Sequence, residues 1–367
     1  MTHGRLHDVR RAARRVAPAL ALVGCAALAA RFAPAHATDG AQRRSYPFVG
    51  RTMGTYDQVV IVTADSAAAA PIAEACQHEF ARLDSVLTNW TTTSEVARLN
   101  RTAGTRTTHV QADVARVIAA AMRTWRESDG AYDITVEPLV RLWGFLAGTP
   151  HVPPRSDIRA AYAHVGAQRV KFDSTASTLR FTQPWVKIDL GGLGKGYAAD
   201  VATGILRERG VSDALVDLSG KMYALGHPAD ADAWRIGIRD PRDRIPYFAR
   251  LTLRDEGIAT SGKYEQFVDA DGKRYGHIMD PRTGWPAQGL ISVTVVTPDA
   301  ITADAWATAL FVLGPRDARR KALERGNVSA VLVVPGAQVD TVFVERSLED
   351  RFVLEDAART LFHVEYF

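Results

Sequence analysis

ATSGKYEQFVDADGKRYGHIMDPRTGWP, residues 259–286, is the stretch from which the fold can be assigned. Strand-like alternation runs from Tyr264 to Val268, the chain turns at Asp271-Gly272, and the alternation returns from Tyr275 to Ile278. Asp-Gly between two strand-like runs is a strong short-range hairpin signal. The stretch therefore predicts a β-hairpin whose second strand ends just after His277.

The end of that hairpin carries reactive side chains. His277, Asp280 and Arg282 bring an imidazole, a carboxylate and a guanidinium into a turn that also contains Pro281 and Gly284. A turn held by a rigid hairpin is a good place to present such groups. Asp-Pro-x-x-Gly is also an ordinary turn sequence, so these residues alone leave open whether the turn is a functional site.

Length and composition describe a globular protein with a full core. The chain has 367 residues, of which 47% are hydrophobic and 23% charged, so it forms two domains or one large one. The net charge is +4, and it is inflated by arginines at the amino terminus, namely Arg5, Arg10, Arg11, Arg14 and Arg15. The rest of the chain is close to neutral, which argues against a nucleic-acid-binding surface.

The amino terminus has the pattern of a secretion signal. The arginines precede an apolar segment, Val16 to Gly24, that is too short to span a bilayer. Leu22-Val23-Gly24-Cys25 resembles a bacterial lipobox, in which the cysteine becomes lipidated, and we expect a signal peptide over residues 1–25 and a lipid anchor at Cys25. The alternative is cleavage after Ala35-His36-Ala37, which gives a signal over residues 1–37. Both predict a protein exported to the periplasmic side of the cell envelope.

The other cysteine, Cys76, lies in an alanine-rich helical stretch. If Cys25 is lipidated or removed, no disulfide framework and no thiolate metal site can form. We expect Cys76 to be a small buried residue.

The pattern of the remaining chain predicts an α+β fold of mostly antiparallel sheets packed with helices. We expect a linker over 38–46, one large domain over 47–346 and a C-terminal appendage over 347–367. The predicted strands are 56–63, 170–173, 178–182, 186–190, 214–218, 223–226, 234–239, 248–253, 291–296, 328–334 and 341–345. The predicted helices, from apolar residues at helical spacing, are 66–89, 110–128, 195–209, 302–313 and 316–325, with Ser94 capping a short helical turn.

A glycine-rich loop separates the predicted strand 186–190 from the helix that follows it. Its sequence is Gly191-Gly192-Leu193-Gly194-Lys195-Gly196. A strand, a glycine loop and a helix can expose backbone N–H groups to a phosphate, and glycines let the backbone approach a ligand closely. The same residues would also serve as a tight turn between a strand and a helix.

Asp304 and Thr308 lie four residues apart in a predicted helix, so both point from one face. A carboxylate and a hydroxyl are oxygen donors that suit Mg²⁺. Two side chains cannot complete an octahedron, so backbone carbonyls, waters or phosphate oxygens would have to supply the other ligands. The alternative is that Asp304 only favours the helix N-terminus electrostatically.

Seven segments, taken in order, resemble the FAD:protein FMN transferase family, the flavin transferases formerly tied to thiamine biosynthesis. The resemblance covers residues 50–314. The segments are Met53-Gly54-Thr55, Ser94-Glu95-x-x-Arg98-Leu99-Asn100, Gly130-Ala131-Tyr132-Asp133 with Pro138-Leu139 and Leu142-Trp143-Gly144-Phe145, Asp189-Leu190-Gly191-Gly192 with Lys195-Gly196-Tyr197-Ala198, Ala259-Thr260-Ser261-Gly262-x-Tyr264-Glu265, His277-Ile278-x-Asp280-Pro281-Arg282-Thr283-Gly284, and Ala303-Asp304-Ala305-x-Ala307-Thr308-Ala309-Leu310.

This resemblance implies a single T-fold-like catalytic domain and a Mg²⁺-dependent reaction. The enzyme would split FAD, pass its FMN moiety to a Thr or Ser hydroxyl of a target protein, and release AMP. The implied targets include subunits of Na⁺-pumping and related electron-transfer complexes. The family is commonly exported, often as a lipoprotein, which agrees with the pattern of the amino terminus.

The resemblance also implies roles for individual residues. Asp304 and Thr308 would hold Mg²⁺ through their side chains and Gly192 through its carbonyl, and His277 is the candidate base for the acceptor hydroxyl. Asp280 is expected to shape its turn. The implied FAD contacts are Met53, Trp90, Ala131, Tyr132, Asp133, Asp189, Lys195 and Ile278.

Several positions depart from the family pattern. Trp90 stands where many members have Tyr, Gly194 where Ala is common, and Gln266 where an Arg is usual, while Leu218-Ser219-Gly220-Lys221 replaces a loop of the Gly-Gly-Asp kind. Trp90 leaves open whether the enzyme transfers FMN or hydrolyses FAD to FMN and AMP. A third hypothesis is a non-catalytic lipoprotein that binds FAD.

Overall fold

The computed structural model describes residues 42–146 and 148–367. The predicted signal peptide, the lipid anchor at Cys25 and the alternative cleavage site after Ala37 lie outside the described residues. Within residues 42–146 and 148–367, no helix is both long enough and apolar enough to cross a bilayer.

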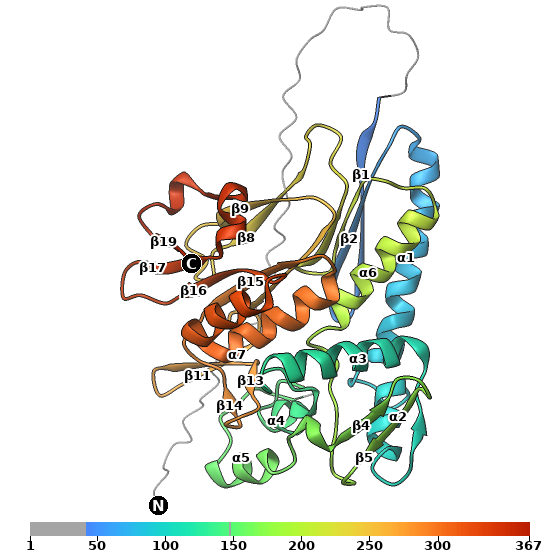
Figure 1. Cartoon of the computed structure of the whole chain (residues 1–367), viewed down its shortest axis with the longest axis vertical. Helices are drawn as coiled ribbons and strands as arrows, with labels where there is room; N and C mark the ends of the chain where they lie inside the picture. The colour runs from blue at the N-terminus through green and yellow to red at the C-terminus, as the bar shows by residue number, and fades with distance from the viewer. Residues whose placement is uncertain (1–41, 147) are drawn as a thin grey trace, which may run out of the picture. The chain divides into compact units, whose positions relative to one another are not determined.

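A nine-stranded sheet forms the centre of the fold, in the order β1-β2-β6-β7-β10-β15-β16-β17-β19 (Figure 1). All neighbouring strands are antiparallel except β17 and β19, so the predicted α+β fold with mostly antiparallel pairing is confirmed. The strands are Arg44–Thr52, Thr55–Thr63, Ala214–Asp217, Lys221–Leu225, Glu256–Gly262, Ser292–Thr297, Ser329–Val334, Asp340–Val344 and Phe362–Tyr366.

Three long helices cover one face of this sheet. They are α1 (Ser66–Leu87), α6 (Gly194–Glu208) and α7 (Ala300–Arg325), and α6 packs between α1 and α7. Alternation along β2 explains the two-sided burial: Val59 and Ile61 join the core beneath the helices, and Val62 joins a second core on the opposite face. Cys76 is fully buried in α1, as expected.

A smaller sheet packs on the opposite face, with β9 (Tyr247–Leu253) between β8 (Trp234–Arg239) and β18 (Phe352–Leu354). Its buried side chains, among them Ile236, Phe248 and Leu251, share one core with residues of the large sheet. The large sheet is therefore covered on both faces.

The remaining elements include a third sheet and four shorter helices, of which α2 contacts α1 and α3 contacts α1 and α7. A three-stranded sheet has the order β3-β5-β4, from Thr108–His109, Thr178–Phe181 and Val170–Asp173. The helices are α2 (Glu95–Thr102), α3 (Ala112–Glu127), α4 (Glu137–Leu142) and α5 (Arg155–Tyr162), and the 3₁₀ turns are Ile134–Val136, Ala167–Arg169, Arg346–Arg351 and Asp356–Ala358. Ser94 caps α2 by accepting the Ala97 N–H at 2.9 Å, as predicted.

The predicted hairpin in residues 259–286 is present. Strands β11 (Phe267–Ala270) and β12 (Lys273–Gly276) pair antiparallel, and β13 (Met279–Asp280) and β14 (Trp285–Pro286) form a second short pair. Asp271 and Gly272 have φ of 50° and 70°, the left-handed conformation for which this dipeptide is favoured. Tyr264 lies in a turn before β11 and not in the strand.

Two predicted boundaries differ from the structure. The expected linker over 38–46 overlaps β1, which starts at Arg44 and pairs with β2 along its whole length. Pro47 is tolerated there because β1 is an edge strand. The segment 347–367, expected to be an appendage, is part of the fold, since it supplies β18 to the small sheet and β19 to the large one.

The predicted strand 186–190 is wrong, because side chains take the place of a neighbouring strand. The Asn100 amide accepts the Ile188 N–H at 2.8 Å and donates to the Ile188 carbonyl at 2.9 Å. Asn89 also donates to that carbonyl, at 2.8 Å, and the Asp189 N–H donates to the Ile134 carbonyl at 2.7 Å. Two asparagines thus satisfy backbone groups that would otherwise need a sheet partner.

The two predicted helices 302–313 and 316–325 form the single element α7, with a kink at Gly314. Gly314 has φ of 77° and Pro315 follows it, so the kink has an identifiable cause. The predicted break is confirmed, although both halves belong to one continuous element.

A glycine allows α6 and α7 to approach closely. A side chain at Gly196 would place its Cβ 2.3 Å from the Ala300 carbonyl oxygen and 2.8 Å from the Asp304 Cβ. Across the same contact, the Asp200 carboxylate accepts the N–H groups of Ala300 and Ile301 at 2.7 and 2.9 Å. The first turns of the two helices therefore lie in direct contact.

We expect Gly196→Ala to lower the free energy of unfolding by about 1–3 kcal/mol, because the new methyl group would force the helices apart. Gly204→Ala is the matched control: it lies in the same helix and its Cβ would meet nothing within 4 Å, so it should stabilise by up to about 1 kcal/mol. Urea denaturation of both variants measures the difference. Equal effects of the two substitutions would contradict the close contact at Gly196.

Candidate functional site

Asp304 and Thr308 lie on the face of α7 that meets α6 and β10. Asp304 is 2% exposed, and its Oδ2 accepts the Gly196 N–H at 3.0 Å. Among the described residues, no group donates a hydrogen bond to its Oδ1. The helix N-terminus is capped by Asp299, which accepts the Thr302 N–H at 2.8 Å. Asp299 therefore caps α7, and the Asp304 carboxylate instead bonds to the glycine loop at Gly196.

The Gly192 carbonyl lies just before α6 and is also free to bind a ligand. The helix begins at Gly194, so the Gly196 N–H is one of the first-turn donors that have no partner within the helix, and Asp304 accepts it. Within the described residues, the Gly192 carbonyl accepts no backbone hydrogen bond. Thr308 Oγ1 has one partner, the Ser261 hydroxyl at 3.3 Å. The three predicted metal ligands thus each have an oxygen with unused capacity.

The chemistry of these oxygens fits a hard cation. Burial raises the pKa of Asp304, and the ammonium groups of Lys221 and Lys195 oppose that shift. A cation at Oδ1 would favour the ionised carboxylate. No group of three or more His, Cys, Asp or Glu side chains with metal-binding geometry occurs in residues 42–146 and 148–367, so a metal here would rely on hydroxyl and carbonyl oxygens beside one carboxylate.

Tyr132 and Asp189 support the glycine loop. The Tyr132 hydroxyl oxygen lies 3.3 Å from the point that a Cβ on Gly192 would occupy. Burial, with the nearby carboxylates of Asp304, Asp189 and Asp133, raises the pKa of Tyr132. The Asp189 carboxylate accepts the Gly191 N–H at 2.8 Å, and burial raises its pKa. These residues hold the loop beside Asp304.

Asp133 is fully engaged with its own chain. Its Oδ1 accepts the N–H and the hydroxyl of Thr135 at 2.7 and 2.6 Å, and its Oδ2 accepts the Ala167 N–H at 2.9 Å. Ala131 is 1% exposed. Of the Gly130–Asp133 motif, Tyr132 is thus the residue whose side chain the structure brings to the glycine loop.

Met53 and Trp90 lie near the carboxyl end of α1. The Met53 N–H donates to Asp84 of that helix at 3.0 Å. The Trp90 side chain is 62% exposed, and its neighbour Asn89 reaches the segment that leads into the glycine loop. An exposed indole at this edge is available to stack on a flat ring.

Two lysines face the same cluster of charges. Lys195 is half-buried, and its pKa is lowered first by burial and then by the charge of Lys221. Lys221 is buried, and its Nζ donates to the Thr260 carbonyl at 2.7 Å and lies 3.8 Å from a Glu265 carboxylate oxygen. Lys221 was noted in the sequence only as a departure from the family pattern, and its place in the site could not be predicted from it.

The hairpin presents His277 with one ring nitrogen against a backbone carbonyl. Its Nδ1 lies 3.3 Å from the Gln266 carbonyl, which can only accept, so Nδ1 carries the proton and Nε2 keeps its lone pair. Burial lowers the pKa of His277, against the opposing charge of Glu265. The Phe145 ring packs edge-on against the imidazole, with centroids 6.4 Å apart. The arrangement suits a base.

The turn after His277 is a structural unit. Ile278 is buried, and its carbonyl accepts the Ala287 N–H at 2.8 Å. Asp280 accepts the backbone N–H and the guanidinium of Arg282 at 2.9 Å each, so its expected role in shaping the turn agrees with these contacts. Arg282 also donates to the Val312 carbonyl of α7 at 3.0 Å.

The aromatic residues of the Leu142–Phe145 motif pack on this hairpin. The Trp143 ring lies 5.4 Å from that of Tyr275 and 5.5 Å from that of Trp285, centroid to centroid. Trp143 of this motif is therefore packed among aromatic side chains of the chain itself.

Several residues that build the site carry no role in the sequence prediction. Asn89 and Asn100 hold the segment before the glycine loop. Ser261 contacts Thr308. The positive charges of Lys221 and His277 both lower the pKa of Glu265. Asn100 ends a motif that the family resemblance includes, which was the one signal for it. A hydrogen bond between an asparagine side chain and a backbone group distant in sequence leaves no periodic pattern from which it could be predicted.

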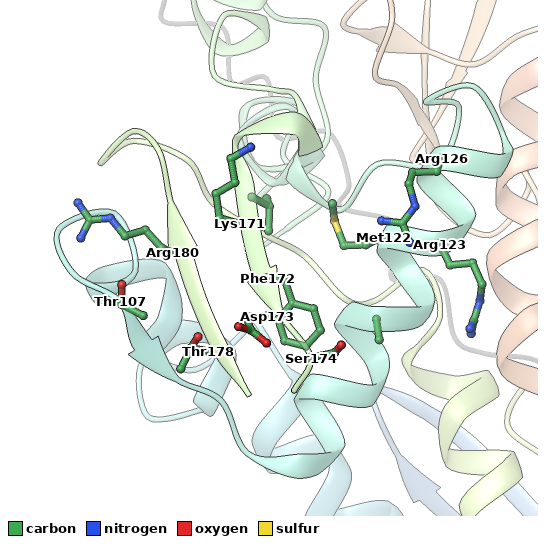
Figure 2. A pocket seen from close by; sticks show the side chains of 12 residues that line it. Thr107, Met122, Arg123, Arg126, Lys171, Phe172, Asp173, Ser174, Thr178 and Arg180 are labelled. Atoms are coloured by element: carbon green, nitrogen blue, oxygen red, sulfur yellow. The ribbon is translucent and has the colours of Figure 1, made fainter. Parts of the chain in front are cut away.

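A surface groove of about 560 Å³ lies apart from these residues, between α3 and strands β4 and β5 (Figure 2). It contains none of the predicted site residues. Figure 2 shows that its four cationic side chains point in different directions and do not converge on one point, and these are Arg123, Arg126, Lys171 and Arg180. The groove is therefore not the predicted site.

Comparison with known proteins agrees with this geometry. The ApbE family model matches residues 53–332. A FAD:protein FMN transferase of Klebsiella pneumoniae is 35% identical over 293 residues, which is 78% of this chain and 84% of the relative. The corresponding protein of Salmonella typhimurium is 35% identical over 283 residues, covering 76% of this chain and 81% of that protein.

Solved structures show the same fold. The flavin transferase ApbE from Vibrio cholerae superposes with a TM-score of 0.77 at 28% identity, covering 84% of this chain and 99% of that one. The apo form of the flavinyl transferase ApbE from Pseudomonas stutzeri gives 0.76 at 32% identity, covering 86% and 98%. The resemblance found in the sequence is confirmed: the chain belongs to the ApbE family.

Proposed function

We propose that this protein is an FAD:protein FMN transferase that uses Mg²⁺ to move FMN from FAD to a Thr or Ser hydroxyl of a target protein, with release of AMP. The observation that carries the proposal is the oxygen cluster beside the glycine loop. A buried carboxylate with one unpaired oxygen, Asp304, lies next to a loop whose Gly192 carbonyl is also unpaired. The family to which the chain belongs gives this cluster its chemical context.

In this proposal, His277 accepts the proton of the target hydroxyl at Nε2. The hydroxyl oxygen forms a bond to the phosphorus of the FMN moiety, and the bond from that phosphorus to the oxygen of the AMP phosphate breaks. The products are the target protein carrying FMN in a phosphoester and AMP. The Gln266 carbonyl supports this role because it holds the proton on Nδ1.

Asp304, Thr308 and Gly192 would hold the metal ion through side-chain and carbonyl oxygens. When bound, Mg²⁺ would supply positive charge against the charge that develops on the phosphoryl oxygens. Lys195 lies at the start of α6, so its ammonium and the N-terminus of that helix would both bind phosphate oxygens. Met53, Trp90, Tyr132, Asp189 and Ile278 would line the dinucleotide, and Ala131 and Asp133 would shape the loop that carries Tyr132.

Export and a lipid anchor at Cys25 complete the proposal, with signal cleavage after Ala37 as the alternative. The partner would be an exported or membrane-bound electron-transfer subunit that presents the acceptor hydroxyl. Metabolic labelling with a fatty acid, compared between wild type and Cys25→Ser, separates anchoring from simple cleavage.

The transfer itself is tested with purified enzyme, FAD, Mg²⁺ and a target subunit. We expect the mass of the target to increase by one FMN while AMP is released. If AMP accumulates and the target mass does not change, the enzyme is an FAD pyrophosphatase. Tight FAD binding without AMP under any metal would make it a non-catalytic flavin-binding protein.

Asp304→Asn should abolish Mg²⁺-dependent turnover. The amide can still accept the Gly196 N–H, so the fold should survive, while the charge that would bind the metal is lost. Calorimetric titration with Mg²⁺ gives a second readout, and Asp317→Asn, at a half-exposed position of the same helix, is the control. Wild-type turnover of Asp304→Asn at millimolar Mg²⁺ would exclude Asp304 as an essential ligand.

His277→Ala should slow transfer by about 10²–10⁴-fold, the range for loss of a general base. The exposed His363→Ala, in β19, is the control. A loss confined to FAD affinity would instead make His277 a positioning residue.

The pH dependence of transfer should follow the lowered pKa of His277. Since burial disfavours the charged imidazolium, the neutral base persists below the ordinary titration range near pH 6.5. The acidic limb of the kcat/KM profile should therefore lie below pH 6.5. An acidic limb above that value would argue against a buried neutral His277 as the base.

A further inference from the structure

Lys221 occupies a position that its own strand fixes. Ser219 and Gly220 form a two-residue hairpin loop between β6 and β7, with φ of 55° and 83°, as a type I′ turn requires. Leu218 and Lys221 pair across the loop, and the Gly220 N–H donates to Asp217 at 2.7 Å. The turn sets Lys221 opposite Ala259 of β10. Further along the same strand, Ser261 contacts Thr308 of α7.

The Lys221 ammonium is buried with few partners. Its side chain is only 7% exposed. One N–H donates to the Thr260 carbonyl at 2.7 Å, and the described residues offer no other hydrogen-bond acceptor. The Glu265 carboxylate is 3.8 Å away, beyond hydrogen-bond distance, so it opposes the charge without accepting an N–H. A buried ammonium with one hydrogen bond keeps donors that the oxygens of an anion could satisfy.

A second ammonium lies in the same cluster. Lys195 precedes Gly196, whose N–H binds Asp304, and Lys221 pairs with the strand whose Ser261 contacts Thr308 of the same helix. The charge of Lys221 contributes to the lowered pKa of Lys195. Two like charges held together on rigid elements, α6 and β7, repel each other. An anion with several oxygens, placed between them, would relieve the repulsion and use the unpaired N–H groups.

We infer that Lys221 is a substrate-binding residue that forms, with Lys195, a two-ammonium subsite for the phosphate oxygens of the dinucleotide. The inference rests on the proposed function for the identity of the anion as the diphosphate of FAD. Because Lys221 extends from the sheet and Lys195 from the glycine loop, the subsite would hold the diphosphate from two separate elements. Lys221 would act by binding and orienting, and it takes no proton in the reaction.

Binding measurements without turnover test this inference. FAD and riboflavin are titrated into the full chain in EDTA, so that no metal-dependent turnover occurs. We expect Lys221→Met to weaken FAD binding by about 10- to 100-fold, the range for a charge-assisted hydrogen bond. Riboflavin, which has no phosphate, should bind Lys221→Met and wild type equally.

Two further variants separate charge from structure. Lys221→Arg keeps the positive charge and should retain FAD affinity within about threefold, a difference smaller than the loss of one hydrogen bond. Lys171→Met removes an exposed lysine of the groove outside the predicted site. It should change the affinity for neither FAD nor riboflavin. Thermal unfolding of each variant, measured beside the titrations, identifies one that fails to fold, and for that variant Lys221→Gln replaces Lys221→Met.

The inference is overturned if Lys221→Met leaves FAD affinity unchanged, or if it weakens FAD and riboflavin equally. It is supported if FAD alone is affected and Lys221→Arg restores binding. These results are independent of the transfer assay. Wild-type protein that binds FAD through its phosphates and releases no AMP would contradict the proposed function and leave the Lys221 subsite standing.

Discussion

The hydrogen bond from the Gly196 N–H to the Asp304 carboxylate is the interaction on which the site depends. It crosses the contact between α6 and α7, which only a glycine allows because a Cβ there would collide with the Ala300 carbonyl. It also gives a first-turn N–H of α6 the acceptor that the helix itself cannot supply. One bond therefore orients Asp304 and joins the first turns of two helices.

Charge balance explains how so many ionisable groups share a small volume. Asp304 and Glu265 oppose the charges of Lys195 and Lys221, while burial lowers the pKa of His277. Ionised groups in a low-dielectric region are stable only when opposite charges or ligands compensate them. In the proposed function, the charge of a cation beside Asp304 and the charge of an anion between the lysines would offset each other.

Much of the fold could be predicted because it follows local rules. Asp271-Gly272 specifies its turn, Gly314-Pro315 breaks α7, and most predicted strands alternate as an antiparallel sheet requires. The strand 186–190 was mispredicted because its backbone partners are the side chains of Asn89 and Asn100, distant in sequence. The 347–367 segment was misjudged for a similar reason, since β19 pairs in parallel with a strand 22 residues earlier.

The site was predicted less completely than the fold. Asp304, Thr308 and the glycine loop were found from spacing, and His277 from its place on the hairpin. Lys221 was visible only as an unexplained difference, because its burial depends on a turn and on β10 together. Asp133 was an expected FAD contact, and its carboxylate accepts hydrogen bonds from the backbone N–H groups of Thr135 and Ala167.

Arg282 connects two separate elements of the predicted site through hydrogen bonds. Its guanidinium binds Asp280 in the turn after His277 and the Val312 carbonyl in the last turn before the Gly314 kink. It thus links the turn after His277 to the half-helix that carries Asp304. The planar guanidinium has donors pointing in several fixed directions, which lets one side chain reach both acceptors. A displacement of the hairpin would therefore be passed through Arg282 to α7 at Val312.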